Sequence, residues 1–149
     1  MRICYVNPTF LVKRPLSELV ERFGEKNEVG VLLPVRPFSK KLKLHHTKKL
    51  QQAKVHTYWA VSPPGNFEWP IPLSPMFFVH LIRMFRRYDV IHMWTFFYPT
   101  TFFVMLAKWL CSKKRLVISC DTFPGLSFSA GKTVDKLFRL FYRVKGWFV

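Results

Sequence analysis

The pattern of apolar and polar residues changes its period several times along the chain, and each change predicts a new element. Residues 2–6 form a short apolar run, which predicts a buried strand that ends at the Asn-Pro pair of positions 7 and 8. Residues 16–23 carry apolar side chains at the i, i+3, i+4 and i+7 spacing of one helix face. A second apolar run at residues 29–33, stopped by Pro34, completes a β-α-β unit. Its short connection predicts parallel strands joined by a right-handed crossover.

The same alternation continues through the rest of the chain. Further strands are predicted at residues 55–61, 89–94 and 115–120, and helices at residues 76–87, 100–111 and 133–145. Strands that alternate with helices predict the α/β class, here a Rossmann-like parallel sheet with flanking helices. The length of 149 residues fits one domain, residues 1–149.

One uncharged stretch of the chain could form either a membrane-spanning helix or several elements of a globular domain. Residues 90–107 contain no Asp, Glu, Lys or Arg, which is about the ~18-residue length at which a spanning helix is considered. His92, a central Pro99 and three threonines interrupt this stretch. A strand, a turn and a helix in series give the same hydropathy, and we favour that interpretation.

Composition narrows the function classes. Half of the residues are hydrophobic and 17% are aromatic, which excludes a disordered tail or a histone-like basic protein. Twenty-four Lys and Arg against eight Asp and Glu leave a net charge of +16. Such a surface attracts phosphate groups of nucleic acids, lipid headgroups or nucleotide-linked substrates. Three cysteines without a C-x-x-C pair argue against a disulfide framework or a zinc module and fit a reducing compartment.

The positive charge is concentrated in two segments. Residues 36–54 hold seven Lys or Arg and two His, and no acidic residue occurs between Glu28 and Glu68. The last predicted helix carries a second basic stripe. We therefore consider as membrane or phosphate contacts Lys40, Lys41, Lys43, Lys48, Lys49, Arg139 and Arg143. The alternative is a solvated loop and helix face, which is what charge runs usually form.

Polar side chains follow several predicted strands at their carboxyl ends, where open parallel sheets bind ligands. Asn7 comes just after the first strand, and His92 and Trp94 close a later one. Asp121 follows an apolar run and opens a Pro-Gly turn. The alternatives are a core histidine bonded to a backbone carbonyl and an aspartate that only forms the turn.

Four segments, taken in order, resemble the N-terminal half of the group 1 (family 4) glycosyltransferases of GT-B fold. They are residues 1–8 (MRICYVNP), 16–23 (LSELVERF), 88–94 (YDVIHMW) and 116–125 (LVISCDTFPG). The resemblance covers nearly the whole chain, and the DVIH strand and the DTFPG turn contribute most. It implies a single family 4-like N-terminal domain that is a truncated half of a GT-B fold.

In this family two Rossmann-like domains face each other across a cleft. The N-terminal domain binds the acceptor and the C-terminal domain binds the nucleotide-sugar, and the sugar is transferred with retention and without a metal held by an Asp-x-Asp motif. The resemblance thus implies no metal and no cofactor, with the nucleotide-sugar as co-substrate. It implies that Asp121 is the catalytic residue, which orients the acceptor hydroxyl. The implied acceptor contacts are Asn7, His92, Trp94, Thr122 and Gly125.

The resemblance also implies partners and a location. Many members act on lipid-linked or glycan acceptors at the cytoplasmic face of a membrane, where they are peripheral. The net charge of +16 and the aromatic content suit an anionic membrane surface, because basic side chains attract headgroups while Trp and Phe lie at the interface. Nucleic acid is not the partner that this resemblance implies.

Three departures from the family pattern limit what carries over. Asn7-Pro8-Thr9 stands where members often have glycines, and Cys120 stands where many have an acceptor-binding histidine. The donor half carries two glutamates with seven other residues between them. All five glutamates here lie between positions 18 and 68, and no two of them have seven residues between them. We expect the donor-binding domain to be absent from this chain, which would then be inactive unless a separate chain supplies that domain.

The alternative from another class is a basic, non-enzymatic module that binds nucleic acid or anionic membrane. Residues 40–59 interleave basic and aromatic side chains, a pattern that serves base stacking and phosphate neutralisation. No fold motif for nucleic-acid binding accompanies it. Steeply salt-dependent binding to single-stranded DNA without binding to anionic liposomes would favour this alternative.

Overall fold

The structure is a computed structural model that describes residues 1–10, 12, 14–37, 50–63, 68–95, 98–111, 114–119, 129 and 132–145. Its strands are β1 (Arg2–Val6), β2 (Glu28–Val35), β3 (Ala53–Val61), β4 (Ile71–Pro72), β5 (Val90–Trp94) and β6 (Arg115–Ser119). Its helices are α1 (Arg14–Gly24), α3 (Met76–Arg87), α4 (Pro99–Cys111) and α5 (Lys132–Lys145).

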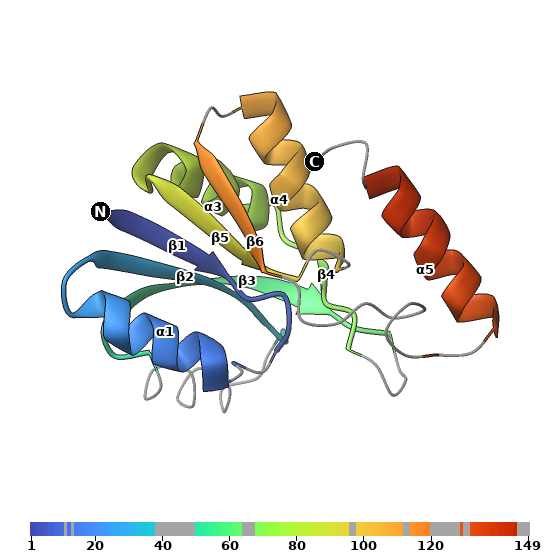
Figure 1. Cartoon of the computed structure of the whole chain (residues 1–149), viewed down its shortest axis with the longest axis horizontal. Helices are drawn as coiled ribbons and strands as arrows, with labels where there is room; N and C mark the ends of the chain where they lie inside the picture. The colour runs from blue at the N-terminus through green and yellow to red at the C-terminus, as the bar shows by residue number, and fades with distance from the viewer. Residues whose placement is uncertain are drawn as a thin grey trace.

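The strands form one six-stranded sheet in the order β4-β3-β2-β1-β5-β6, and all pairs except β3–β4 are parallel (Figure 1). Without β4, this is the strand order of a Rossmann-like sheet, in which the direction of chain progression reverses next to β1. The predicted α/β class with flanking helices is therefore confirmed, and the sheet is compatible with a Rossmann-like fold. The predicted parallel sheet holds for every pair but one: the segment before α3 returns alongside β3, and two residues of β4 pair with it antiparallel.

The prediction that Pro34 stops the second strand is also wrong. Strand β2 continues through Pro34 to Val35, and Pro34 is in register with Tyr58 of β3. The carbonyl of Leu32 accepts a hydrogen bond from the backbone amide of Asn7, so the backbone groups of Leu32 point toward β1. Two residues later in the strand, the backbone nitrogen of Pro34 points to the same side. Because β1 ends at Val6, the missing amide hydrogen of Pro34 leaves no ladder bond unmade.

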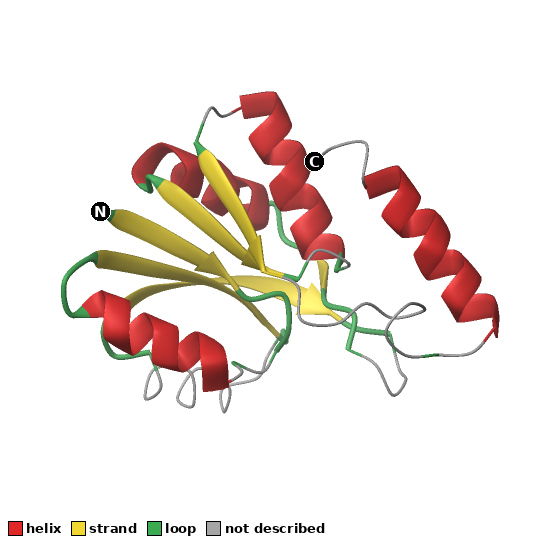
Figure 2. Ribbon diagram, viewed as in Figure 1, coloured by secondary structure: helices red, strands yellow, loops and turns green. Residues whose placement is uncertain are grey.

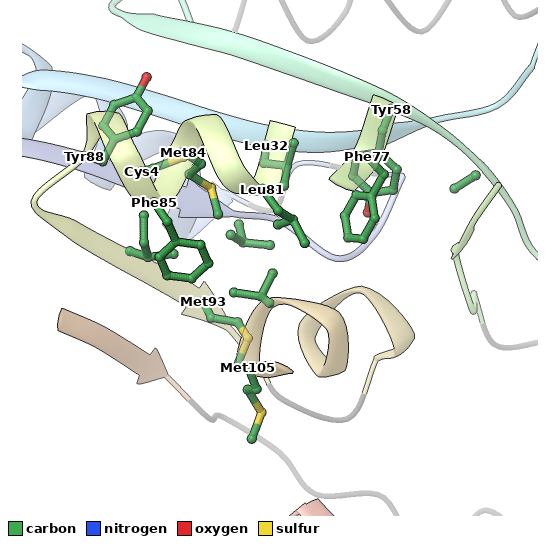
Figure 3. Close-up of a cluster of buried hydrophobic side chains, with 14 of the residues drawn as sticks. Cys4, Leu32, Tyr58, Phe77, Leu81, Met84, Phe85, Tyr88, Met93 and Met105 are labelled. Atoms are coloured by element: carbon green, nitrogen blue, oxygen red, sulfur yellow. The ribbon is translucent and has the colours of Figure 1, made fainter. Parts of the chain in front are cut away.

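Helices cover both faces of the sheet (Figure 2). Helix α1 packs on one face over residues of β1 and β2, among them Tyr5 and Val31. Helices α3 and α4 cover the other face, where Phe77 and Phe85 of α3 lie among Met93 and other residues of β5, β1 and α4 (Figure 3). The strands in the middle of the sheet are thus buried on both sides, as expected for a parallel sheet.

The uncharged stretch at residues 90–107 is divided between β5 and α4, so the predicted strand and helix are confirmed, while the predicted turn between them includes residues outside the described ones. Within the described residues, no helix has both the length and the apolar character needed to cross a bilayer.

The amino edge of the sheet is held by ion pairs. The guanidinium of Arg2 and the carboxylate of Asp89 lie 2.8 Å apart, and this contact holds the pKa of Asp89 at about 2. Lys114 lies 3.8 Å from the same carboxylate, and Arg87 pairs with Glu28. The contacts of Asp89, just before β5, join it to the starts of β1 and β6, and the contact of Glu28 joins the start of β2 to the end of α3. The carboxyl edge lies at the opposite end of the strands.

Candidate functional site

The carboxyl ends of β1 and β5 lie side by side at the place where the sheet reverses its direction. The register pairs Val6 with Met93, so that Asn7 and Trp94 come next on their strands. Asn7 is buried, and its side-chain amide donates a 2.6 Å hydrogen bond to the carbonyl of Thr9. The structure thus places Asn7 at the edge indicated by the sequence, where its amide holds the loop that follows β1.

His92 lies on β5 on the same face of the sheet as α1. Its Nε2 atom is 2.7 Å from the hydroxyl of Ser119 on β6, and its ring centroid is 5.1 Å from that of Tyr5 on β1. The imidazole is half-buried, and this desolvation lowers its pKa below the ordinary value of 6.5. The ring is therefore neutral at pH 7, so it can either accept a hydrogen bond from Ser119 or donate one to it.

Two polar groups at this edge are buried without a hydrogen bond. Within the described residues, neither Nε1 of Trp94 nor Oγ1 of Thr95 has a partner. Thr95 is only 3% exposed, so water does not satisfy its hydroxyl from the surface. A buried polar group left unpaired costs about 1–3 kcal/mol, which makes such groups uncommon unless a ligand or another function uses them.

The backbone at Thr95 is strained as well. Its φ angle is 60°, in the left-handed region that β-branched residues rarely adopt. The Thr95 amide donates a 2.7 Å hydrogen bond to the carbonyl of Ser119, which extends the β5–β6 pairing by one residue. Strain of this kind costs about 1–3 kcal/mol and is found preferentially at binding and catalytic sites.

Strands β1, β5 and β6 thus bring together one edge cluster, consisting of Asn7, His92, Trp94, Thr95 and Ser119. It offers an indole N–H donor, a hydroxyl that both donates and accepts, and a neutral imidazole paired with a second hydroxyl. Groups of this kind recognise a polar, uncharged ligand such as one rich in hydroxyl groups.

Of this cluster, Asn7, His92 and Trp94 are predicted from the sequence, whereas Thr95 and Ser119 are not. Thr95 is the first polar residue after the apolar end of β5, which was a usable signal. Ser119 could be found only from the register, because that register decides which β6 side chain reaches His92.

The other residues named from the sequence fall into two groups. Asp121, Thr122 and Gly125, together with Lys40, Lys41, Lys43, Lys48 and Lys49, lie outside the described residues. Arg139 and Arg143 are exposed on α5, as the basic stripe predicts. Helix α5 lies at the side of the molecule (Figure 1) and packs through Phe138 and Tyr142 against Trp69 and Tyr98.

A second group of titratable side chains lies between β3 and α3 and was not singled out from the sequence. The rings of His56 and His80 are 5.7 Å apart, and Nε2 of His56 is 3.4 Å from the hydroxyl of Tyr88. Burial, followed by nearby positive charge, lowers the pKa of both histidines. The cavity beside them has a volume of about 20 Å³, which is room for one water molecule rather than a ligand.

A larger hollow of about 210 Å³ lies further along β3, between Trp59 of that strand and Met76 of α3. Thr57, Ser74 and His80 also line it. Within the described part of the chain, no group of three or more His, Cys, Asp or Glu is placed to hold a metal ion. The edge cluster therefore remains the place where strain and unpaired polar groups coincide.

Comparison with models of protein families, with curated proteins and with solved structures finds no match to this chain.

Proposed function

We propose that this chain is the acceptor-binding, N-terminal domain of a membrane-associated glycosyltransferase of GT-B fold. The observation that carries the proposal is the edge cluster at the β1–β5 reversal, where Thr95 combines a left-handed backbone with a buried, unpaired hydroxyl. Ligands of Rossmann-like sheets bind at this reversal. The four sequence segments that resemble the family supply the identity of the reaction.

The reaction is attack of an acceptor hydroxyl on the anomeric carbon of a nucleotide-activated sugar. A C–O bond to the acceptor forms, the bond from the anomeric carbon to the nucleotide's phosphate oxygen breaks, and the proton of the acceptor hydroxyl passes to the departing phosphate. The nucleotide leaves as its diphosphate. In this proposal Trp94 and Thr95 hold hydroxyl groups of the acceptor, and Asp121 orients the hydroxyl that attacks.

A donor-binding domain is needed to complete the reaction. The paired glutamates of that domain do not occur among residues 1–149, where the last glutamate is Glu68. The domain would come from another chain or from residues beyond these, and it would bind the nucleotide-sugar. No metal and no further cofactor enter this scheme.

The proposal includes a peripheral location on the cytoplasmic face of a membrane, where a lipid-linked or glycan acceptor is available. The net charge of +16 favours approach to anionic headgroups. Arg139 and Arg143 lie exposed on one side of α5, and the lysines between positions 40 and 49 add to this attraction.

The test is sugar transfer by the complete two-domain enzyme. We expect Asp121→Ala to lower turnover by about tenfold or more, since a positioned acid or base contributes ~10²–10⁴-fold to such reactions. The matched control is Asp135→Ala on α5, which should leave turnover unchanged. An unchanged rate for Asp121→Ala would remove that residue from the site.

A further inference from the structure

Helix α4 is apolar around its whole circumference, although the sheet covers only one side of it. Val104 and Met105 face the core, and Lys108 is the only charged residue among its 13 residues. On the outward side, Trp109 is 67% exposed and Leu110 is 62% exposed. A helix that is apolar all round is normally buried in protein or in lipid.

Helix α3 extends this apolar surface. Phe78 is 50% exposed and Ile82 is 45% exposed, whereas Phe77, Leu81, Met84 and Phe85 of the same helix are buried in the core. The ring of Phe78 meets that of Phe103 on α4 at 5.5 Å, which joins the surfaces of the two helices. The α3–α4 face is defined here as Phe78, Ile82, Phe103, Leu106, Trp109 and Leu110.

The charge around the α3–α4 face has one sign. Neither helix contains an acidic residue, and α3 ends with the exposed Arg83, Arg86 and Arg87. Of these, Arg87 is paired with Glu28 of β2. An apolar face with an arginine rim suits a surface that combines hydrocarbon with negative charge, as an anionic bilayer does at its headgroup boundary.

The length of α4 decides how it would meet such a bilayer. Thirteen residues at ~1.5 Å each give a helix of about 20 Å, shorter than the ~30 Å of the hydrocarbon layer. A helix of this length that contacts a bilayer can lie along the interface but cannot cross the hydrocarbon layer. Because α3 and α4 are fixed to the sheet by the shared core, the whole domain is then oriented by this contact.

We propose that the α3–α4 face docks this domain on an anionic bilayer, with Trp109 and Leu110 inserted at the level of the headgroups. This inference rests on the membrane location proposed above and not on sugar transfer. It assigns the apolar contact to the α3–α4 face, while the lysines and α5 provide long-range attraction only.

The test is flotation of the 149-residue chain with vesicles of equal parts phosphatidylcholine and phosphatidylglycerol, and with vesicles of phosphatidylcholine alone. We expect the chain to bind the anionic vesicles. In the double variant Ile82→Ser/Leu110→Ser the affinity for these vesicles should fall by about tenfold or more, since each substitution removes a large apolar side chain. Both positions are exposed, so folding should be kept, which circular dichroism checks. The matched control is Leu137→Ser/Leu140→Ser on α5, where the two leucines are 63% and 57% exposed.

A second measurement does not depend on affinity. Lipids brominated in the upper acyl chain should quench tryptophan fluorescence of the bound chain, and Trp109→Phe should remove most of that quenching while binding persists. Unchanged quenching in Trp109→Phe would overturn the proposal, as would a loss of binding only in the α5 variant. A loss of binding only in the α5 variant would still support the membrane location. An absence of binding to anionic vesicles would contradict both the membrane location and docking through the α3–α4 face, and it would leave the proposal of sugar transfer unaffected.

Discussion

The amide of Thr95 donates a 2.7 Å hydrogen bond to the carbonyl of Ser119, and this bond holds Thr95 at a φ angle of 60°. The bond continues the β5–β6 pairing one residue past the end of β5, to the last residue of β6. It fixes a β-branched residue in a strained conformation and buries its hydroxyl without a partner. Two costs at one residue, each of about 1–3 kcal/mol, are the physical basis for placing a ligand site there.

Replacement of Thr95 by valine should stabilise the free domain. The variant keeps the β-branched shape, so the backbone strain is unchanged, while the unpaired hydroxyl becomes a methyl group. We expect the free energy of unfolding to rise by about 1 kcal/mol, as measured by urea denaturation. If the Thr95 hydroxyl binds the acceptor, its removal should lower the affinity for the acceptor in the same variant, as expected when a binding residue is replaced by a more stable one.

The matched control is Thr100→Val, which removes a hydroxyl that is fully used. Thr100 Oγ1 lies 2.7 Å from the hydroxyl of Tyr58, and both residues are buried. This variant leaves the Tyr58 hydroxyl unpaired and should lower the free energy of unfolding by about 1–3 kcal/mol. Equal destabilisation by both variants would mean that the Thr95 hydroxyl already has a partner.

The half-buried histidines predict a pH dependence of stability. Burial is the largest cause that lowers the pKa of His56, His80 and His92 in the folded chain below the ordinary value of 6.5. At a pH between the lowered pKa of the folded chain and 6.5, the unfolded chain binds more protons than the folded one. The free energy of unfolding is therefore greatest above pH 6.5 and falls as the pH decreases below that value. Imidazole NMR titration should give three folded pKa values below 6.5.

Urea denaturation at a series of pH values provides the second check of this prediction. The variant His92→Gln removes one of the three groups and should make the decrease in stability below pH 6.5 shallower. A pKa for His92 at or above 6.5 would show that its ring is more solvated, or more strongly paired with a negative charge, than the Ser119 contact implies.

Gly30 of β2 is required because the ring of Tyr88 lies directly on it. A Cβ atom at position 30 would overlap the Tyr88 hydroxyl and ring, which are held in the core below α3. We expect Gly30→Ala to lower the free energy of unfolding by about 1–3 kcal/mol through overpacking. In the double variant with Tyr88→Ala, the loss in free energy of unfolding should be smaller than the sum of the losses in the two single variants. Strictly additive losses would show that the two residues are not in contact.

The sequence was sufficient for elements whose periodicity and ends agree. Helix α3 has the predicted bounds, because an apolar stripe, an arginine-rich end and the following Tyr-Asp pair all mark the same residues. The continuation of β2 through Pro34 could not be predicted, since it depends on where the neighbouring strand β1 ends. Strand β4 was missed because two residues are too short for any periodic signal.

The candidate site was predictable in position and not in detail. Asn7 and His92 follow from the rule that ligands bind at the carboxyl edge of a parallel sheet. The partners of these side chains depend on register, which pairs His92 with Val117 and thereby brings Ser119 within reach. The left-handed backbone of Thr95 has no signal in its residue type, since threonine rarely adopts it.

The measurement that tests the central claim most directly is amide NMR of the 149-residue chain titrated with a panel of methyl glycosides, and separately with an oligodeoxythymidine. The edge cluster predicts saturable shifts at Asn7, Thr95 and Ser119 with at least one glycoside, and their loss in Thr95→Val. Steeply salt-dependent binding of the oligonucleotide, with no glycoside shifting these amides, would contradict the claim and favour a nucleic-acid-binding module.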